Sequence, residues 1–334
     1  MERIFAYRRT AKMPRITALL SPSFDQQDGL VSLNYSPVAH NTLHAFPKGW
    51  TPVLRLCRGT VFDRSGRLVA LAFPKFFNFG EHPESSELPN EPFTATVKYD
   101  GHLGIVFRTP NGRLRLATRQ SFNGPSAKLG SMLLERTATK NRWKSDDLPC
   151  GLTLLVEIIH PRTKVHVDYG RRRGFVLIGA TNGLHDCDHD ELEALGRRLG
   201  LPVTERWTGK SIADLRKLMR DRTAANQEGY VVRFKNGLRV KFKFESYIGL
   251  MVQDKLSYGY LINRTLSGNL EKMLRTLPEE VRDEADQMVR NLFRAKRIGD
   301  EKKRRAYLYG LDKKREKNQH YRGQCRRFLA SIAK

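Results

Sequence analysis

Alternating apolar and polar positions between about residue 50 and residue 250 predict short β-strands separated by tight turns. "LRLCRGTVFD" and "RLVALAF" form one predicted hairpin, and the dipeptides Asn111-Gly112 and Asn236-Gly237 mark the turns of two more. A spacing of three to four residues predicts helices in "SAKLGSMLLERTAT", "DELEALGRRLG" and "SIADLRKLMRDRT", each with Ser or Asp near its start. Because hairpins and helices are interleaved without a regular β-α-β alternation, we expect an α+β domain with antiparallel sheets.

The pattern changes after about residue 248, where helical spacing continues and strand signals end. "LEKMLRTLPEEVRDEADQMVRNLFRAKRI" is typical of this part, in which Lys and Arg outnumber Asp and Glu about two to one. We therefore predict two domains, a mixed domain over residues 1–248 and a small, basic, all-helical domain over residues 249–334.

The charge of the chain narrows the choice of partner. The 334 residues carry a formal net charge of +25, and a surface this positive is typical of proteins that bind a polyanion. Nucleic acid is the first candidate and an anionic membrane surface the second, although no apolar run approaches the roughly 20 residues that span a bilayer. The four cysteines lie far apart without a C-x-x-C pair, which favours reduced thiols in a cytoplasmic compartment.

The hairpin around Asn236-Gly237 gathers charge on one side. If these two residues form a two-residue turn, strand alternation divides the flanking side chains between two faces. The polar face then carries Glu228, Tyr230, Lys241 and Lys243, and the apolar face carries Val231, Val240, Phe242 and Phe244. Taken alone, this hairpin reads as an edge strand with solubilising lysines.

Lys98 changes that interpretation because it interrupts the strand-forming run "TVKYDGHLGIVF". A lysine with its ordinary pKa is neutral in only about one molecule in 2,500 at pH 7, and burial or nearby cations raise that fraction. If Lys241 and Lys243 lie beside Lys98, they lower its pKa and stabilise a phosphate that it attacks. A carboxylate such as Glu228 could hold the divalent metal ion that this chemistry uses.

Two segments resemble other kinds of site. "TGKS" at 208–211 resembles a phosphate-binding P-loop but lacks its first glycine, because residue 204 is Thr, so we expect Ser211 to cap the next helix. "HDCDHDE" at 185–191 is rich in metal-ligand types, but it precedes a predicted helix, where Asp residues favour the first turn. We predict helix capping at both segments.

An ordered series of motifs carries a family resemblance. It consists of K-x-D-G at 98–101, then "LLVEIIHP", "GFVLIGATN", "EGYVV" and "VKFK". This order resembles the covalent nucleotidyltransferases, the nucleic-acid ligases and capping enzymes. "CRGTVFD" and "PKFFNFGE" upstream, and "KFKFESY" before a helical tail, are similar to the RNA ligase 1 family typified by the T-even bacteriophage enzyme.

The resemblance implies a nucleotidyltransferase fold of the ligase type and an ATP-dependent RNA ligase. In that family the motif lysine attacks the α-phosphate of ATP and forms lysyl-AMP. AMP then passes to a 5′-phosphate RNA end, and a 3′-hydroxyl displaces it to seal the strand. ATP and Mg²⁺ or Mn²⁺ are the implied cofactors. The implied partner is structured RNA, such as a nicked tRNA, with no membrane and no obligate protein partner.

The resemblance also assigns residues. Lys98 is the implied nucleophile, Glu157 binds the ribose, Glu228 serves the metal or the nucleotide, and Tyr247 serves the sealing step. The other implied ATP contacts are Tyr35, Arg58, Lys75, Phe77, Arg119, Lys241 and Lys243. Phe77 is either a packing or a base contact.

Physical arguments independent of the resemblance indicate roles for three polar residues. Glu157 interrupts an apolar strand, and a buried carboxylate is costly unless it is paired, which favours a function. A two-residue turn at Asn111-Gly112 places Arg119 opposite Gly104, near the predicted active-site loop. We expect Asp100 to fix that loop by accepting hydrogen bonds rather than by touching substrate.

Three other functions are compatible with the same motifs. A DNA ligase and an mRNA capping guanylyltransferase share the lysine chemistry, but both usually carry a β-barrel OB domain after the K-x-K motif. The strand-poor tail of this chain disfavours them. A non-catalytic RNA-binding protein that has kept the fold is the alternative from a different class.

Overall fold

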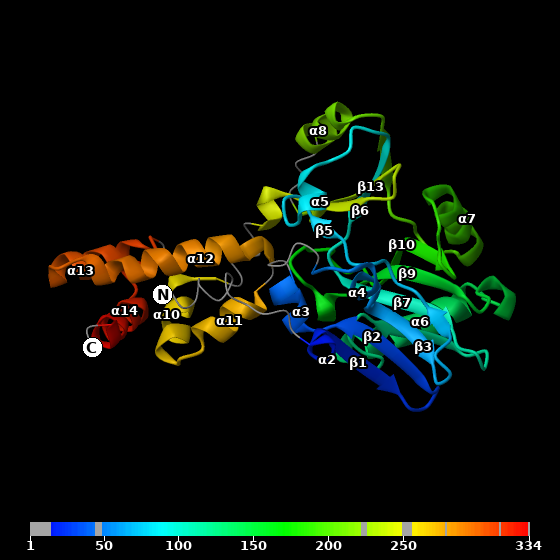
Figure 1. The fold of residues 1–334 in the computed structure, drawn as a ribbon, viewed down its shortest axis with the longest axis horizontal. Coiled ribbons are helices and arrows are strands. Elements are labelled where there is room, and N and C mark those ends of the chain that lie inside the picture. Colours follow the sequence, from blue (N-terminus) through cyan, green and yellow to red (C-terminus); the bar gives the residue numbers. More distant parts are fainter. Residues whose placement is uncertain are drawn as a thin grey trace. The chain divides into compact units, whose positions relative to one another are not determined.

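The computed structural model describes residues 15–43, 49–221, 226–248, 256–277, 279–313 and 315–332 (Figure 1). These residues fall into two compact units, which divide between Phe244 and Glu245. The larger unit combines β-sheets with helices, and the smaller unit is helical in its described part. The predicted α+β class with a helical C-terminal part is therefore confirmed.

Three β-sheets form in the described part of the larger unit. The first sheet has the order β1 (Leu20–Asp25), β2 (Leu30–Tyr35), β3 (Arg58–Asp63) and β4 (Leu68–Ala70). The central sheet has the order β11 (His185–Asp186), β10 (Gly174–Asn182), β9 (Leu152–Ile159), β7 (His102–Arg108) and β8 (Leu114–Thr118). The third sheet has the order β12 (Arg206–Gly209), β6 (Phe93–Lys98), β13 (Gly229–Phe234), β14 (Arg239–Lys243) and β5 (Phe77–Asn78). Among the described strands of these sheets, only β14 and β5 pair in parallel.

The predicted helices form α6 (Pro125–Lys140), α7 (His189–Leu199) and α8 (Ile212–Asp221). Short helices complete the unit: α2 (Ile16–Leu19), α3 (Pro37–Thr42), α4 (Pro52–Leu56) and α5 (Pro83–Ser86). The predicted caps form, because Asp188 accepts from the backbone N–H groups of Asp190 and Glu191, and Ser211 accepts from that of Asp214.

The central sheet is buried on both faces, and this sandwich forms the core. Leu129 and Leu133 of α6 pack with Val106 of β7 on one face. Ile105 and Phe107, the neighbours of Val106, point to the opposite face and pack against the first sheet. A strand buried on both sides reads as a nearly continuous apolar run, which is the pattern of β7 and β9.

Both predicted two-residue turns are wrong by one residue. Arg108 pairs with Leu114, and Gly104 pairs with Thr118 rather than with Arg119. In the second hairpin Val231 pairs with Lys241, and Tyr230 pairs with Phe242 rather than with Lys243.

The cause is the backbone conformation of the Asn-Gly pairs. Only the glycine has a positive φ, +83° at Gly112 and +88° at Gly237, whereas a two-residue turn of the predicted type needs positive φ at both positions. Each loop therefore takes one more residue. This shift moves Tyr230 to the apolar face and Val231 to the face of Lys241 and Lys243.

Glu228 reaches the lysine face because Gly229 breaks the alternation. Strand periodicity would place Glu228 on the side of Tyr230, yet its carboxylate pairs with Lys98 and Lys243. Gly229 has a φ of +149°, and a Cβ atom there would lie 1.9 Å from the carbonyl oxygen of Phe242. A glycine is therefore required between the carboxylate and β13.

Helices make up the described part of the smaller unit: α10 (Tyr258–Leu266), α11 (Leu270–Thr276), α12 (Glu279–Arg294), α13 (Glu301–Gly310) and α14 (Gln319–Ile332). Its core contains Leu261, Val289 and Phe328, all fully buried. The Tyr321 hydroxyl donates to the Leu308 carbonyl at 2.8 Å and joins α14 to α13. Among the described residues, no helix has the length and apolar character required to cross a membrane.

The Gly229→Ala variant is expected to lose about 2–5 kcal/mol of unfolding free energy, because the new methyl group meets both an unfavourable φ and a backbone oxygen. Gly237→Ala is the matched control. Gly237 also has a positive φ, but no heavy atom lies within 4 Å of its added Cβ, so only about 1 kcal/mol is expected. Urea unfolding measures both values, and equal losses would contradict the assigned role of Gly229.

Candidate active site

A cleft of about 1660 Å³ lies between the third sheet and the central sheet. Thr96 and Lys98 line it from β6, and Glu157 and Ile178 line it from β9 and β10. Arg58 also lines it, from the start of β3. The larger unit therefore places the predicted nucleophile, a carboxylate and an arginine around one opening.

Strand register arranges the residues of β6, β13 and β14 in rows, and each row contributes at least one residue to the lining of the cleft. The first row is Lys98, Gly229 and Lys243, the second is Thr96, Val231 and Lys241, and the third is Thr94, Arg233 and Arg239. Successive rows are two residues apart, which is about 7 Å along a strand. Charged side chains thus extend along the cleft over a distance comparable with a bound nucleotide.

Lys98, Glu228 and Lys243 form one buried ion cluster. Glu228 is 3% exposed, and its two carboxylate oxygens lie 2.6 Å from Lys98 Nζ and 3.1 Å from Lys243 Nζ. The Lys98 side chain is 22% exposed and lines the cleft. The Lys98 amine is therefore held within the cleft by a neighbouring carboxylate and is not free in bulk water.

Lys241 lies next to this cluster without an ion pair among the described residues. Its Nζ donates to the Phe76 carbonyl oxygen at 3.0 Å and lies 4.7 Å from the centre of the Phe76 ring. Burial lowers the pKa of Lys241 well below its usual value, and the charges of Lys75, Arg58 and Lys98 add to this. An anion in the cleft would restore the charged form, so the position favours phosphate binding.

Glu157 is the second carboxylate of the cleft. Its Oε1 accepts from the Gly101 N–H at 2.9 Å. Burial raises the pKa of Glu157 to about 7, against the lowering effect of Lys98. A Cβ at Gly101 would lie 2.4 Å from the Ile158 carbonyl oxygen, which explains why glycine follows Asp100.

Asp100 has the structural role that the sequence predicted. It is buried, and its Oδ2 accepts from the N–H groups of His166 and Val167, both at 2.7 Å. The Asp100 N–H in turn donates to the Tyr169 hydroxyl at 2.8 Å. Asp100 therefore fixes the loop that follows Lys98 to the segment between β9 and β10.

Tyr35, Arg58 and Arg119 lie together. Arg119 Nη1 donates to the Tyr35 hydroxyl at 2.7 Å. Burial lowers the pKa of Arg58, and the charge of Arg119 lowers it further while Tyr35 and Glu157 act in the opposite direction. These three predicted ATP contacts are thus grouped by tertiary structure, although the predicted pairing of Arg119 with Gly104 is wrong.

Lys75 and Phe77 lie outside the lining of the cleft. Lys75 is 4% exposed, and its Nζ pairs with Glu81 at 2.6 Å. Phe77 is fully buried and stacks on His82 with the ring centres 4.2 Å apart. Of the two roles left open for Phe77, this position fits packing.

Tyr247 lies in the helical segment 245–248 and is buried. This segment belongs to the smaller unit, whereas the residues that line the cleft all belong to the larger unit.

Arg233 and Arg239 line the far end of the cleft but were missing from the sequence analysis. Both pair with Asp186, at 3.2 Å and 2.5 Å. The signal was present in the sequence, because both arginines alternate with hydrophobic residues in the hairpin. Strand alternation alone puts Arg239 on the face of Lys241, but only the correct register adds Arg233 to that face.

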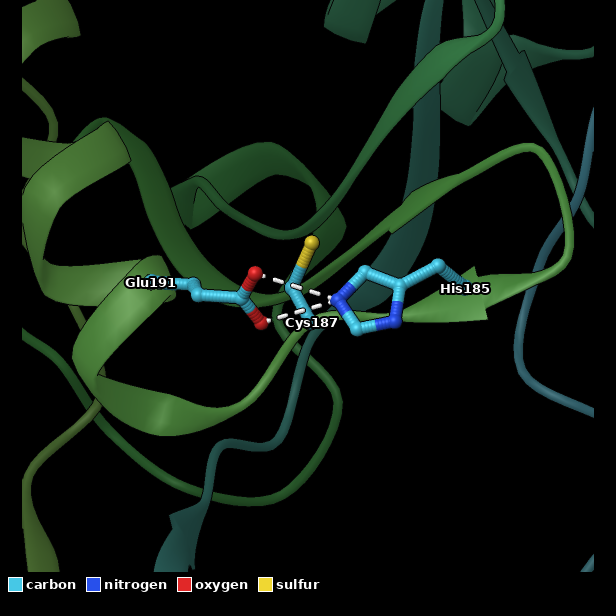
Figure 2. Close-up of side chains that lie close together, drawn as sticks. All are labelled: His185, Cys187 and Glu191. Carbon is cyan, nitrogen blue, oxygen red and sulfur yellow. Dashed lines mark hydrogen bonds and ion pairs between the residues drawn. The ribbon is translucent and has the colours of Figure 1, made fainter.

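Figure 2 shows His185, Cys187 and Glu191, whose possible ligand atoms all lie within 4.8 Å of one another. His185 Nε2 pairs with the Glu191 carboxylate at 3.0 Å, and the same carboxylate accepts from the Asp188 N–H at 2.7 Å. Glu191 is therefore engaged in capping α7, whose positive N-terminal end disfavours a cation. The sequence predicted the capping of α7, and the ion pair between His185 and Glu191 is an addition that the structure shows.

The Glu157→Gln variant is expected to change the pH dependence of stability. Because the folded-state pKa is raised from 4.5 to about 7, the contribution of this group is complete below pH 4.5 and lost as the pH rises through 7. The unfolding free energy of the variant relative to wild type should therefore increase with pH, by about 1–3 kcal/mol in total. Urea unfolding of both proteins from pH 4.5 to 8 measures this difference in unfolding free energy. A difference that does not change with pH would contradict the raised pKa of Glu157.

Two curated proteins are similar to this chain in sequence. A provisionally named RNA ligase of Thermovibrio ammonificans is 28% identical over 214 residues, which cover 62% of this chain and 53% of that protein. RNA ligase 1 of bacteriophage TS2126 is 30% identical over 140 residues, which cover 35% of this chain and 32% of that protein. The chain thus spans about half or less of the length of these curated relatives.

Solved structures of ligases are more distant. An archaeal ATP-dependent RNA ligase, form 2, has a TM-score of 0.49 at 13% identity and covers 90% of this chain and 80% of its own. A Naegleria gruberi RNA ligase solved with PPi has a TM-score of 0.40 at 15% identity, over 48% of this chain and 51% of its own.

The family comparison covers the cleft itself. The model of a protein family described as RNA ligase matches residues 56–247, which include Arg58, Lys98, Glu157, Glu228 and Lys241. Since this match extends over more than half of the 334 residues, the protein is a member of that RNA ligase family.

Proposed function

We propose that this protein is an ATP-dependent RNA ligase that works through a lysyl-AMP intermediate. The observation that carries the proposal is the Lys98–Glu228–Lys243 cluster, which opens into a cleft of nucleotide size beside Lys241 and Arg58. Membership of the RNA ligase family supports the same reaction.

In the first step, the Lys98 Nζ lone pair attacks the α-phosphorus of ATP. A nitrogen–phosphorus bond forms, the bond to the bridging oxygen breaks, and pyrophosphate leaves with the electron pair. The nitrogen begins as an ammonium group and ends as a phosphoramidate N–H, so it loses two protons. Glu228 Oε2, at 2.6 Å, is the group placed to accept each proton and pass it to solvent.

The other residues of the cleft position the substrate. Lys241, Lys243 and Arg58 supply positive charge where the phosphate gains negative charge in the transition state. Glu157 accepts hydrogen bonds from the ribose hydroxyls. Tyr35 and Arg119 orient Arg58, whereas Lys75 and Phe77 support the wall of the cleft from the buried cluster around Glu81.

The donor set fits a hard divalent cation, Mg²⁺ or Mn²⁺. Glu228 offers carboxylate oxygens beside Lys98, which lines the cleft, and carboxylate oxygen is the ligand type that these ions prefer. When bound, such an ion neutralises phosphate charge and weakens the hold of the carboxylate on the Lys98 amine.

Two further steps complete the proposed reaction. A 5′-phosphate oxygen of RNA attacks the phosphorus of lysyl-AMP, the nitrogen–phosphorus bond breaks with its electron pair on nitrogen, and Lys98 regains the two protons that it lost in the first step. A 3′-hydroxyl then attacks the RNA 5′-phosphorus and loses its proton to solvent, the phosphoanhydride bond to AMP breaks, AMP leaves with the electron pair, and the phosphodiester forms. Tyr247 is the residue that we assign to this sealing step, by its place after the K-x-K motif.

We assign residues 1–248 to an adenylyltransferase domain and residues 249–334 to an RNA-binding domain. The net charge of +25 and the lysines and arginines of the helical part support binding to structured RNA, such as a nicked tRNA. The four free cysteines support a reducing, cytoplasmic location, and the proposed reaction needs no obligate protein partner.

The Lys98→Arg variant is expected to abolish self-adenylylation and to leave RNA affinity within about twofold, because arginine keeps the charge but does not release a proton. The assay incubates the protein with α-labelled ATP and Mg²⁺ and detects acid-labile label on lysine. Lys128→Arg is the matched control, since Lys128 is exposed on α6 and lies outside the cleft. Full labelling of Lys98→Arg would remove this residue from the mechanism.

The same assay separates the alternatives. Labelling by GTP rather than ATP would favour a capping guanylyltransferase, and joining of DNA but not RNA ends would favour a DNA ligase. RNA binding without label from either nucleotide would favour the non-catalytic RNA-binding protein.

Truncation after residue 248 tests the assigned domains. The shortened protein should keep self-adenylylation, because the cleft lies wholly within the larger unit. Joining of a nicked, structured RNA should fall about tenfold or more, since part of the positive surface is lost. Unchanged joining of structured RNA would show that the helical part has a different role.

A further inference from the structure

A run of three arginines lies in the connection between β9 and β10, next to the nucleophile. Arg171, Arg172 and Arg173 are all exposed, and they directly precede β10. The Arg172 guanidinium lies 5.6 Å from the centre of the Tyr99 ring. Tyr99 follows Lys98 in the chain and lines the cleft, so this contact places positive charge at the edge of the site.

The arginine run belongs to a segment that is fixed to the nucleophile loop. Asp100 accepts from the N–H groups of His166 and Val167, and its own N–H donates to the Tyr169 hydroxyl. The Arg172 N–H donates to the Tyr169 carbonyl at 3.2 Å. The backbone of the arginine run is therefore connected to the loop after Lys98 through Tyr169 and Asp100.

A second connection joins the segment to the other side of the site. Asn226 donates from its side-chain amide to the Asp168 carbonyl, and its amide oxygen accepts from the Asp168 N–H, both at 2.7 Å. Asn226 lies two residues before Glu228. The arginine segment is thus attached both to the loop of the nucleophile and to the segment before β13 that carries Glu228.

The three arginines are not neutralised within the described structure, where none of them has an ion-pair partner. Asp168, the nearest acid in the segment, pairs with Lys164 at 2.9 Å. Arg162 and Arg173 both lie close enough to His160 for their charges to lower its pKa, in addition to the effect of burial. This concentration of uncompensated positive charge favours binding of an anion with several charges.

We propose that Arg171, Arg172 and Arg173, with the Tyr99 ring, bind the phosphate backbone of the RNA strand whose 5′ end is being joined. Guanidinium groups match phosphate oxygens in a bidentate geometry, and an aromatic ring beside them provides a face on which a base can stack. The surface adjoins Lys98, where a 5′-phosphate must arrive to receive AMP. The inference rests on the proposed ligase function.

ATP also carries phosphates, so the experiment must distinguish binding of RNA phosphates from binding of ATP phosphates. The test variant is Arg171→Ala/Arg172→Ala/Arg173→Ala in the full chain. The matched control is Lys128→Ala/Arg136→Ala/Lys140→Ala, because these three exposed cations lie on α6 and outside the cleft. Both variants lose three positive charges, so any difference reports on position rather than on net charge.

Affinity for a 5′-phosphorylated single-stranded RNA is measured by fluorescence anisotropy at several salt concentrations. The test variant should bind about tenfold or more weakly, with a salt slope lower by about 2, because about 0.7 counterions are released per single-strand phosphate contact. The control variant should change affinity by no more than about twofold. The KM for ATP in self-adenylylation should be the same in the test variant as in wild type.

Equal RNA affinities in the test and control variants would overturn the inference. A raised KM for ATP with unchanged RNA affinity would assign the arginines to the nucleotide instead and would also overturn it. Failure of the proposed function is seen separately, as absence of labelling by ATP in the wild-type protein, while the RNA affinities still decide whether this surface binds RNA.

Discussion

The candidate site depends on one buried carboxylate. Glu228 is almost inaccessible to solvent, and an ionised carboxylate in such a position costs several kcal/mol unless cations compensate it. Lys98 and Lys243 provide that compensation from the ends of β6 and β14, the two strands that flank β13. The same interaction that satisfies Glu228 therefore fixes the position of the Lys98 amine in the cleft.

The backbone around Glu228 contains glycines at the two positions where any other residue would clash. Gly229 adopts a φ that brings Glu228 to the lysine face, and Gly101 allows the loop after Lys98 to pass against the backbone of β9. Asp100 then fixes this loop to the segment that carries the arginine run. The Lys98 amine, the Glu228 carboxylate and the arginine run thus depend on the same few backbone contacts. A substitution at Gly229, Gly101 or Asp100 would therefore displace several functional groups together.

Local signals in the sequence were sufficient for much of the fold. Helix caps at Asp188 and Ser211 and the alternation of the strands identify their elements because neighbouring residues alone determine them. The loop-fixing role of Asp100 was also predictable, since a short acidic side chain next to glycine favours hydrogen bonds to the backbone. The residue roles in catalysis stay predictions that the proposed experiments address.

The sequence by itself determined the α+β class, the order of the motifs and the residue types that meet in the cleft. Only the tertiary structure decided strand register, and therefore whether Tyr230, Val231 and Arg233 lie on the face of Lys241. The physical reason is that side chains alternate with a period of two, so one extra loop residue moves a whole set to the other face. Whether an Asn-Gly pair forms a two- or three-residue loop depends on the sign of φ at asparagine, which the surrounding strands determine.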